Sequence, residues 1–175
     1  MTKRKIVFLT GTRADFGKLK PLMDKIEKSE IFDCHIFITG MHTLKKYGNT
    51  YQEVMKCNYK NTLVYENQKS SNEQDVILAN TIYGFSEYIK NLQPDMIIVH
   101  GDRVEALGGA IVGSLNNILV SHIEGGEISG TVDELIRHAV SKLSHIHFVA
   151  NSEAKDRLLQ MGEKEEIKKK KKTCW

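Results

Sequence analysis

Cysteine is scarce in this 175-residue chain, and its placement excludes a structural bridge or a zinc centre. The three cysteines, Cys34, Cys57 and Cys174, show neither zinc-ligand spacing nor a disulfide framework. This usage is typical of a reducing compartment, and we expect a cytoplasmic protein. Long apolar runs are also missing, so we expect no signal peptide and no membrane partner.

Aromatic residues make up only 7% of the chain, and they do not alternate with basic residues. The stacking platforms that bind single-stranded nucleic acid are therefore missing. The formal net charge is +3, and its excess lies largely in the lysine run 168–172. We predict no nucleic-acid partner. A hydrophobic content of 41% is sufficient for one well-buried domain.

Short apolar runs alternate with helical patterns along the chain. We expect strands at Lys5–Thr10, Cys34–Thr39, Thr62–Tyr65, Met96–His100, Ile118–Ile123 and His145–Ala150. We expect helices at Asp15–Ser29, Tyr51–Lys56, Asn72–Leu92, Arg103–Leu115, Val132–Leu143 and Ser152–Met161. This alternation predicts an α/β fold, a doubly wound parallel sheet of Rossmann-like type. We expect it to cover residues 1–162, followed by a charged, disordered tail at 163–175.

A glycine-bearing turn follows the first expected strand, with the sequence Gly11-Thr-Arg-Ala-Asp-Phe-Gly-Lys18. Such a turn directs backbone N–H groups and the positive end of a helix dipole at a ligand, which favours an anion such as a phosphate. It is not a Walker A loop, since Leu19 follows Lys18, and it lacks the Gly-x-Gly-x-x-Gly pattern. The alternative is an ordinary turn with a solvated helix start.

Two further strand ends carry polar residues. His100-Gly-Asp102-Arg103 follows the fourth expected strand, and His122-Ile-Glu124-Gly-Gly-Glu127 follows the fifth. The carboxyl ends of parallel strands meet at one edge, so these segments are expected to share a cleft with the first turn. Taken singly, Asp102 could cap a helix, the two glycines could form a tight turn, and His122 could be a core histidine.

The helix expected after Gly130 adds a third group of polar residues. Thr131 and Glu134 have the spacing of a capping box. Asp133 and Arg137 are i,i+4 partners that flank one edge of an apolar stripe, where a side chain can enter a cleft. That stripe consists of Val132, Leu135, Ile136, Ala139, Val140 and Leu143. Asp133 is therefore favoured over Glu134 for chemistry, with an ordinary surface ion pair as the alternative.

Several carboxylates near arginines suit proton transfer at carbon, since a carboxylate whose pKa is raised by burial or by a like charge can act as a general base. A second interpretation uses His100, Asp102, His122 and Glu124 as metal ligands. Residues two apart on a strand lie on one face, so each His-x-acid pair could bind one ion. That interpretation would make the protein a metal-dependent hydrolase.

Together, these motifs resemble those of the hydrolysing UDP-N-acetylglucosamine 2-epimerases of the sialic acid pathway, over about residues 5–162. Thr12-Arg-Ala-Asp15 and Glu124-Gly-Gly-Glu127 are similar to the hydrolysing branch rather than the non-hydrolysing one. The resemblance implies elimination of UDP from UDP-N-acetylglucosamine, followed by addition of water to give N-acetylmannosamine.

The resemblance also implies roles for individual residues. The expected acid, base and stabilising carboxylates are Asp102, Glu124 and Asp133. The expected substrate-binding residues are Arg13, Lys18, Arg137 and His122. The resemblance implies no metal and no cofactor, and it implies a nucleotide-sugar substrate and a homo-oligomeric full-length protein.

Members of this family have two Rossmann-like domains of the GT-B type and are about twice as long. The resemblance therefore implies that this chain corresponds to the N-terminal half alone, with a frameshift or truncation in the lysine run. We expect little or no epimerase activity from the chain by itself, because half a cleft does not exclude water or position UDP. The alternatives are an epimerase for a UDP-2,4-diacetamido sugar of the legionaminic acid pathway, or a non-catalytic remnant domain.

Overall fold

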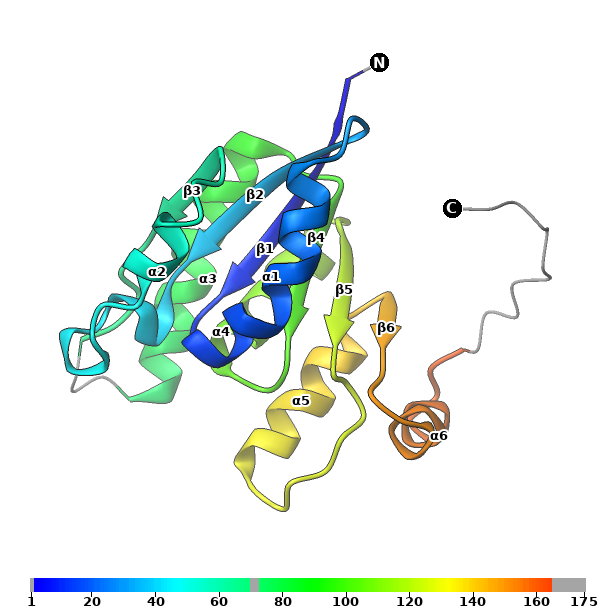
Figure 1. The fold of residues 1–175 in the computed structure, drawn as a ribbon. Helices are drawn as coiled ribbons and strands as arrows, with labels where there is room; N and C mark the ends of the chain where they lie inside the picture. The colour runs from blue at the N-terminus through cyan, green and yellow to red at the C-terminus, as the bar shows by residue number, and fades with distance from the viewer. Residues whose placement is uncertain (1, 70–72, 165–175) are drawn as a thin grey trace.

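A computed structural model describes residues 2–69 and 73–164. Six strands form one sheet in the order β3-β2-β1-β4-β5-β6, and every neighbouring pair is parallel (Figure 1). The strands are β1 (Arg4–Thr10), β2 (Phe32–Ile38), β3 (Asn61–Val64), β4 (Met96–His100), β5 (Leu119–Ile123) and β6 (Ile146–Phe148). The strand order reverses between β1 and β4, which is where open α/β sheets bind ligands. The predicted doubly wound α/β fold is confirmed.

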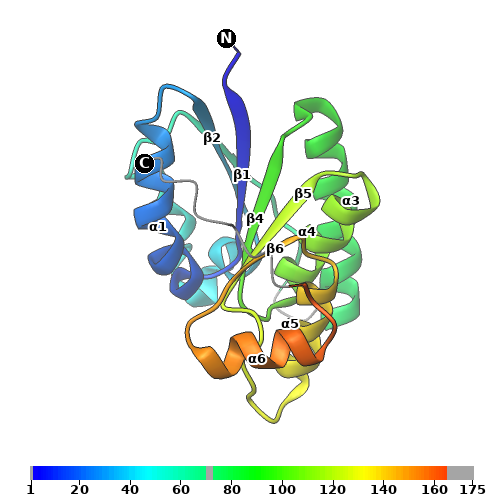
Figure 2. The same ribbon diagram turned by 90° about the vertical axis from the view of Figure 1, so that its right-hand side faces the viewer.

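Helices cover both faces of the sheet. They are α1 (Arg13–Glu27), α2 (Tyr51–Met55), α3 (Gln74–Leu92), α4 (Val104–Leu115), α5 (Val132–Lys142) and α6 (Ser152–Gln160). Two short 3₁₀ turns, η1 (Gly40–Thr43) and η2 (Lys45–Tyr47), follow β2. Figure 2 shows α1 on one side of the sheet and α3 with α4 on the other. This arrangement places the first turns of α1 and α4 at the same edge, beyond β1 and β4.

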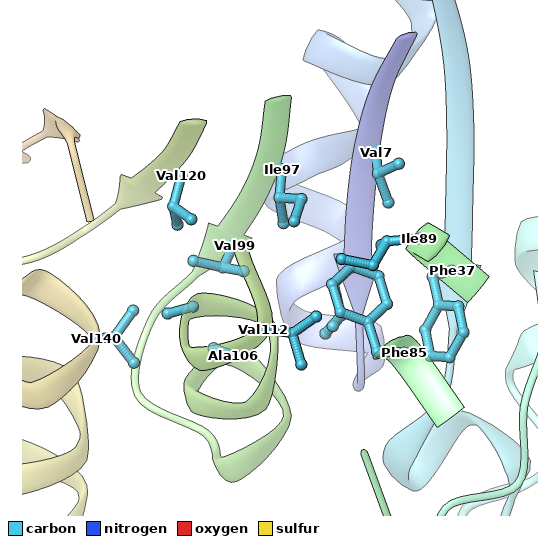
Figure 3. Packing of buried hydrophobic residues seen from close by; sticks show 12 residues of the cluster. Val7, Phe37, Phe85, Ile89, Ile97, Val99, Ala106, Val112, Val120 and Val140 are labelled. Carbon is cyan, nitrogen blue, oxygen red and sulfur yellow. The ribbon is translucent and has the colours of Figure 1, made fainter. Parts of the chain in front are cut away.

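The two faces of β1 supply two separate cores. Val7 packs with Phe85 of α3 and Val99 of β4 in the first core (Figure 3). Phe8 points to the opposite face and packs with Leu19 of α1 in the second core. Because successive side chains of a strand alternate between faces, a strand buried on both faces needs a continuous apolar run. This is the physical reason that the central strands could be predicted so closely.

The capping box lies on a different helix from the predicted one. Thr131, the N-cap residue of α5, makes no side-chain capping bond, and its Oγ1 lies 3.2 Å from Ser129 Oγ. Glu134 instead accepts from the backbone N–H groups of Ser129 at 2.9 Å and Gly130 at 2.8 Å. The capping box belongs to α1, where Thr12 and Asp15 bond each other's backbone N–H groups. Thr131 and Glu134 have the sequence spacing of a capping box. Glu134 does not complete one, because it accepts hydrogen bonds from N–H groups of the loop before α5 instead.

The apolar stripe predicted for α5 is only partly buried. Val140 is fully buried and Ile136 packs against the first core, but Val132 and Leu135 are 60% and 70% exposed. The first turn of α5 extends beyond the edge of the sheet, so nothing in the described chain covers its apolar side chains (Figure 1).

Glu163, the first residue of the predicted tail, contacts two side chains of the domain. Glu163 accepts from Lys142 Nζ at 2.6 Å, and its other oxygen lies 3.3 Å from His147 Nε2. The rest of the predicted tail, residues 165–175, lies outside the described residues, as does Cys174. None of the helices that the structure describes has both the length and the apolar character needed to cross a membrane.

Candidate active site

Three of the predicted segments meet in one pocket at the carboxyl edge of the sheet. The pocket has a volume of about 240 Å³. Its lining residues are Thr12, Ala14, Asp15, Lys18, His100, Gly101, Asp102, Arg103, Glu124 and Arg137. The predicted convergence of the turn after β1 with the ends of β4 and β5 is therefore confirmed. Four of the seven predicted site residues line the pocket, namely Lys18, Asp102, Glu124 and Arg137.

Glu124 bonds two side chains from other elements. One of its oxygens accepts from Lys18 Nζ at 2.6 Å and lies 3.1 Å from His100 Nε2. Partial burial opposes ionisation of Glu124, but Lys18 and His100 outweigh that effect and lower its pKa. The backbone of Glu124 has φ +62°, which is uncommon for a residue with a side chain. Strained backbone positions cluster at functional sites, so the left-handed backbone of Glu124 supports a functional role for its side chain.

Arg137 does not form the predicted pair with Asp133. Its Nη2 contacts the carboxylate of Asp102, and its Nη1 donates to the Glu127 carbonyl at 3.1 Å. The side chains of Arg137 and Asp102 are only 13% and 26% exposed. Asp133 is exposed and does not line the pocket. A half-buried guanidinium needs a carboxylate partner, and Asp102 supplies one inside the pocket, whereas Asp133 lies in solvent.

His122 is fully buried, so the expected contact with substrate is not available to its ring. Its Nε2 lies 2.8 Å from the Gly101 carbonyl oxygen, and its Nδ1 lies 3.0 Å from Ser141 Oγ. A Cβ atom on Gly125 would lie 2.8 Å from both His122 Nδ1 and Ser141 Oγ. His122 thus joins β5 to the turn after β4 and to α5, which corrects its assignment as a substrate-binding residue.

Arg13 also lies apart from the pocket. Its side chain is 74% exposed and its Nε is 3.2 Å from Glu53 of α2. Because Arg13 is the first residue of α1, its side chain extends away from the sheet edge toward α2. The structure does not bring it together with Lys18 and Glu124.

The N–H groups of the glycine-bearing turn are already occupied. One oxygen of Asp15 accepts from Gly11 N at 3.0 Å and from Thr12 N at 3.1 Å. The other accepts from Thr10 Oγ1, which lies 3.0 Å from His42 Nε2. These two amides of the turn are therefore occupied by the chain's own carboxylate rather than being free for an anion. Burial raises the pKa of Asp15 to about 6, and the hydrogen bonds only partly offset that rise.

His100 and Arg103 line the pocket, but the sequence did not single them out for proton transfer or substrate binding. His100 was considered only as a metal ligand. Within residues 2–69 and 73–164, no group of three or more His, Cys, Asp or Glu side chains is placed to hold a metal ion. Both ring nitrogens of His122 are engaged by other groups, so the proposed four-ligand set is not assembled. The available signal for His100 was its place at a strand end, directly before Gly101.

Two buried histidines should make the fold sensitive to acid. Burial lowers the pKa of His42 and of His122 to about 4. An unfolded histidine titrates near 6.5, so the unfolded chain takes up protons that the folded chain excludes. As the pH falls from about 6.5 to about 4, each histidine should remove roughly 3 kcal/mol from the free energy of unfolding.

Asp15 works in the opposite direction, because its raised pKa stabilises the fold as the pH falls from about 6 to 3.8. We expect the free energy of unfolding to fall overall on acidification, because two histidines lower it and only Asp15 raises it. Urea unfolding of the wild type and of His42→Gln at pH 7 and pH 4.5 tests this. The variant keeps hydrogen-bonding groups for Thr10 and Thr50 but has no titrating ring. If the free energy of unfolding fell equally in both proteins between pH 7 and pH 4.5, His42 would not be a source of the acid sensitivity.

Comparison with known proteins places the chain in a family. Residues 24–169 match the family model described as UDP-N-acetylglucosamine 2-epimerase. The chain belongs to this epimerase family. It is 54% identical over 161 residues to the UDP-N-acetylglucosamine 2-epimerase of Neisseria meningitidis serogroup B, a match that covers 92% of this chain and 43% of the relative.

Two other members of the epimerase family extend the comparison. The chain is 44% identical to the UDP-N,N'-diacetylbacillosamine 2-epimerase (hydrolyzing) of Legionella pneumophila, covering 93% of this chain and 44% of the relative. The Methanocaldococcus jannaschii UDP-GlcNAc 2-epimerase, solved in complex with UDP-GlcNAc and UDP, superposes with a TM-score of 0.77 at 27% identity. That superposition covers 91% of this chain and 44% of the solved chain. The chain thus spans less than half the length of the epimerases it matches.

Proposed function

We propose that this chain forms the carboxylate-bearing side of a hydrolysing UDP-N-acetylglucosamine 2-epimerase site. The observation that carries the proposal is the pairing of Glu124 with Lys18 and His100, beside the Asp102–Arg137 pair in one pocket. Family membership supports the epimerase chemistry, and the ligands named for the Methanocaldococcus structure support a UDP-sugar.

Glu124 is the general base in this proposal. It faces the pocket and is ionised near neutral pH, although Lys18 and His100 outweigh the effect of burial and lower its pKa, whereas the sequence led us to expect a raised one. Asp102 is the alternative base, since Arg137 pairs with it as Lys18 pairs with Glu124. Asp102 and Arg137 instead form a charged wall that orients the substrate, and His122 holds the Gly101 carbonyl next to Asp102.

The proposed reaction has two steps. Glu124 removes the C2 proton of the sugar while the C1–O bond to UDP breaks, which leaves a C1=C2 double bond in a 2-acetamidoglucal. Water then adds across this double bond: its hydroxyl group bonds to C1, and its proton reaches C2 through a group on the opposite face, giving N-acetylmannosamine. Glu124 returns its proton to solvent, and UDP is released. Lys18 lies beside Glu124 and can offset the negative charge that develops as UDP leaves.

Arg13 and Asp133 remain candidates only at the exposed rim of this site. Both side chains face solvent beyond the pocket, where a facing part of a complete two-domain epimerase could engage them. The hydrolysing assignment rests on Thr12-Arg-Ala-Asp15 and Glu124-Gly-Gly-Glu127, together with the name of the Legionella relative.

A chimera provides the test. Residues 5–162 of this chain replace the matching segment of the Neisseria relative, which supplies the remaining length. Incubated with UDP-N-acetylglucosamine, the chimera should release UDP and N-acetylmannosamine, both quantified by NMR. UDP-N-acetylmannosamine without free UDP would overturn the hydrolysing assignment, and no turnover would overturn the epimerase proposal. Because the chain matches only 43% of the Neisseria relative, the chain alone should give little or no product.

A second candidate substrate is UDP-N,N'-diacetylbacillosamine, favoured by the 44% identity to the Legionella relative. Its reacting C2 and its diphosphate are the same chemical groups, so the pocket described here suits both sugars. Comparing kcat/KM for the two nucleotide sugars in the same chimera decides between them. A third possibility, a non-catalytic remnant domain, predicts that the chain alone binds no UDP in calorimetry.

A further inference from the structure

The turn that follows β5, Glu124-Gly125-Gly126, carries the proposed base on an unusual backbone. Glu124 has φ +62° and Gly126 has φ +80°, so two of the three residues are left-handed. Left-handed backbone is unfavourable for a residue with a side chain, and it persists only where the surrounding structure holds it. The direction of the Glu124 carboxylate therefore depends on the contacts that hold this turn.

The first two residues of the turn are held by the sheet. The N–H of Glu124 donates to the carbonyl of Phe148, at the end of β6, at 2.8 Å. Gly125 lies so close to β5 that a Cβ atom there would be 2.8 Å from His122 Nδ1. Neither contact holds the third residue, Gly126, whose backbone is free to adopt many conformations unless another element restrains it.

Gly126 is held by α6. Figure 2 shows α6 beside the segment that joins β5 to α5, and a Cβ atom on Gly126 would lie 2.3 Å from the Ala154 carbonyl oxygen. Three residues further along α6, Arg157 donates from Nη1 to the Gly126 carbonyl. Arg157 is partly buried and does not line the pocket, so it holds the turn from outside the pocket.

The bond that Arg157 makes is stronger than an ordinary contact between a helix and a loop. A hydrogen bond from a charged donor is roughly twice as strong as one between neutral groups. Its acceptor is a main-chain carbonyl of the turn, so the bond fixes a peptide orientation rather than another side chain. That orientation sets the backbone two residues after Glu124, where a change of conformation would swing the carboxylate.

We propose that Arg157 is a positioning residue for the reaction, because its bond to the Gly126 carbonyl keeps the turn in the conformation that directs the Glu124 carboxylate at Lys18 and His100. The inference rests on the proposed function for the role of Glu124 as the base. A displacement of 1 Å in a reacting group can cost about 100-fold in rate, so a restraint from α6 has a consequence in the pocket.

Four charged or titratable groups of the pocket surround Glu124. Lys18 of α1 lies 2.6 Å and His100 of β4 lies 3.1 Å from one of its oxygens. Asp102 and Arg137, which also line the pocket, pair with each other. Lys18 and His100 outweigh the effect of burial and hold the pKa of Glu124 below its ordinary value. The protonation of Glu124 therefore reports whether these contacts are kept.

A pH titration of the purified chain tests this geometry without needing activity. The Glu124 carboxyl carbon is followed by ¹³C NMR in the wild type and in Arg157→Gln, with Glu124→Gln identifying its signal. In Arg157→Gln the pKa of Glu124 should rise toward its ordinary value, because a loosened turn separates the carboxylate from Lys18 and His100. An unchanged titration would overturn the inference.

Two further variants control this measurement. Arg157→Lys keeps a charged donor and should give a smaller rise; if Arg157→Gln fails to fold, the absence of any rise in Arg157→Lys overturns the inference. Lys142→Gln is the matched control, because Lys142 donates to the Met161 carbonyl at the end of α6 at 3.2 Å without touching the turn. It should leave the Glu124 titration unchanged, and an equal rise would mean a general loosening of α6 instead.

The chimera tests the consequence for the reaction. Arg157→Gln should lower kcat roughly 10- to 100-fold, with KM within about twofold, since a displaced base affects the chemical step rather than substrate binding. Arg157→Lys should restore part of kcat. Turnover with kcat unchanged by Arg157→Gln rejects the positioning role alone. No turnover, with a Glu124 titration that still depends on Arg157, rejects the epimerase function alone.

Discussion

Glu124→Gln in the chimera should lower kcat by roughly 10²- to 10⁴-fold, the usual contribution of a general base. Glutamine has nearly the same shape and can still accept a hydrogen bond from Lys18, but it cannot take a proton from carbon. We therefore expect little change in KM. Initial rates of UDP release over a range of substrate concentrations separate the two constants.

Glu127→Gln is the matched control, three residues further along the same loop. Its side chain bonds Asn151 rather than a pocket residue, and its backbone carbonyl, which Arg137 contacts, is unchanged. This variant should keep kcat within about twofold of the unmodified chimera. If Glu124→Gln were also to retain full kcat, the proton would have to go to another group, with Asp102 the next candidate.

Gly126→Ala should lower the free energy of unfolding of the chain by about 2 to 5 kcal/mol, the sum of a left-handed backbone and an overpacked contact. Gly126 has φ +80°, and a Cβ atom there would lie 2.3 Å from the Ala154 carbonyl oxygen. That oxygen belongs to the α6 backbone, which cannot move as an exposed side chain could. Urea unfolding at pH 7 measures the loss.

Two other glycines separate the causes of this effect. Gly130 has φ +69° with open space around it, so Gly130→Ala should show only the backbone cost, about 1 to 2 kcal/mol. Gly17 has helical backbone and nothing near its missing Cβ, so Gly17→Ala should stabilise the chain by about 0.5 to 1 kcal/mol. Equal losses at 126 and 130 would show that α6 is not packed against Gly126.

Most of the fold could be predicted from local patterns. The strands at residues 96–100 and 119–123 were placed within one residue. The first is apolar up to His100, as burial on both faces requires, whereas the second also buries Ser121 and His122. Helix α5 was also placed correctly, and its apolar residues were predicted to share one face. Periodicity shows which side chains share a face, whereas burial of Val132 and Leu135 depends on what lies opposite.

The sequence predicted which segments meet at the candidate site, but it did not predict which side chains contact each other there. The convergence of the three loops follows from parallel topology, because all carboxyl ends lie at one edge. Individual partners do not follow from spacing. Arg137 contacts Asp102, which is distant in sequence, and Asp15 occupies the amides that a phosphate was predicted to use.

Residue order alone determined the α/β architecture, the family motifs and the edge of the sheet at which the polar residues gather. Only the tertiary structure decided that His122 lies buried against Gly101, that Arg13 lies outside the pocket, and that Glu105 holds Arg103. The physical reason is desolvation. Hydrophobic periodicity acts within a few residues, but a charged or polar group that loses water must find its partner on whichever element packs against it.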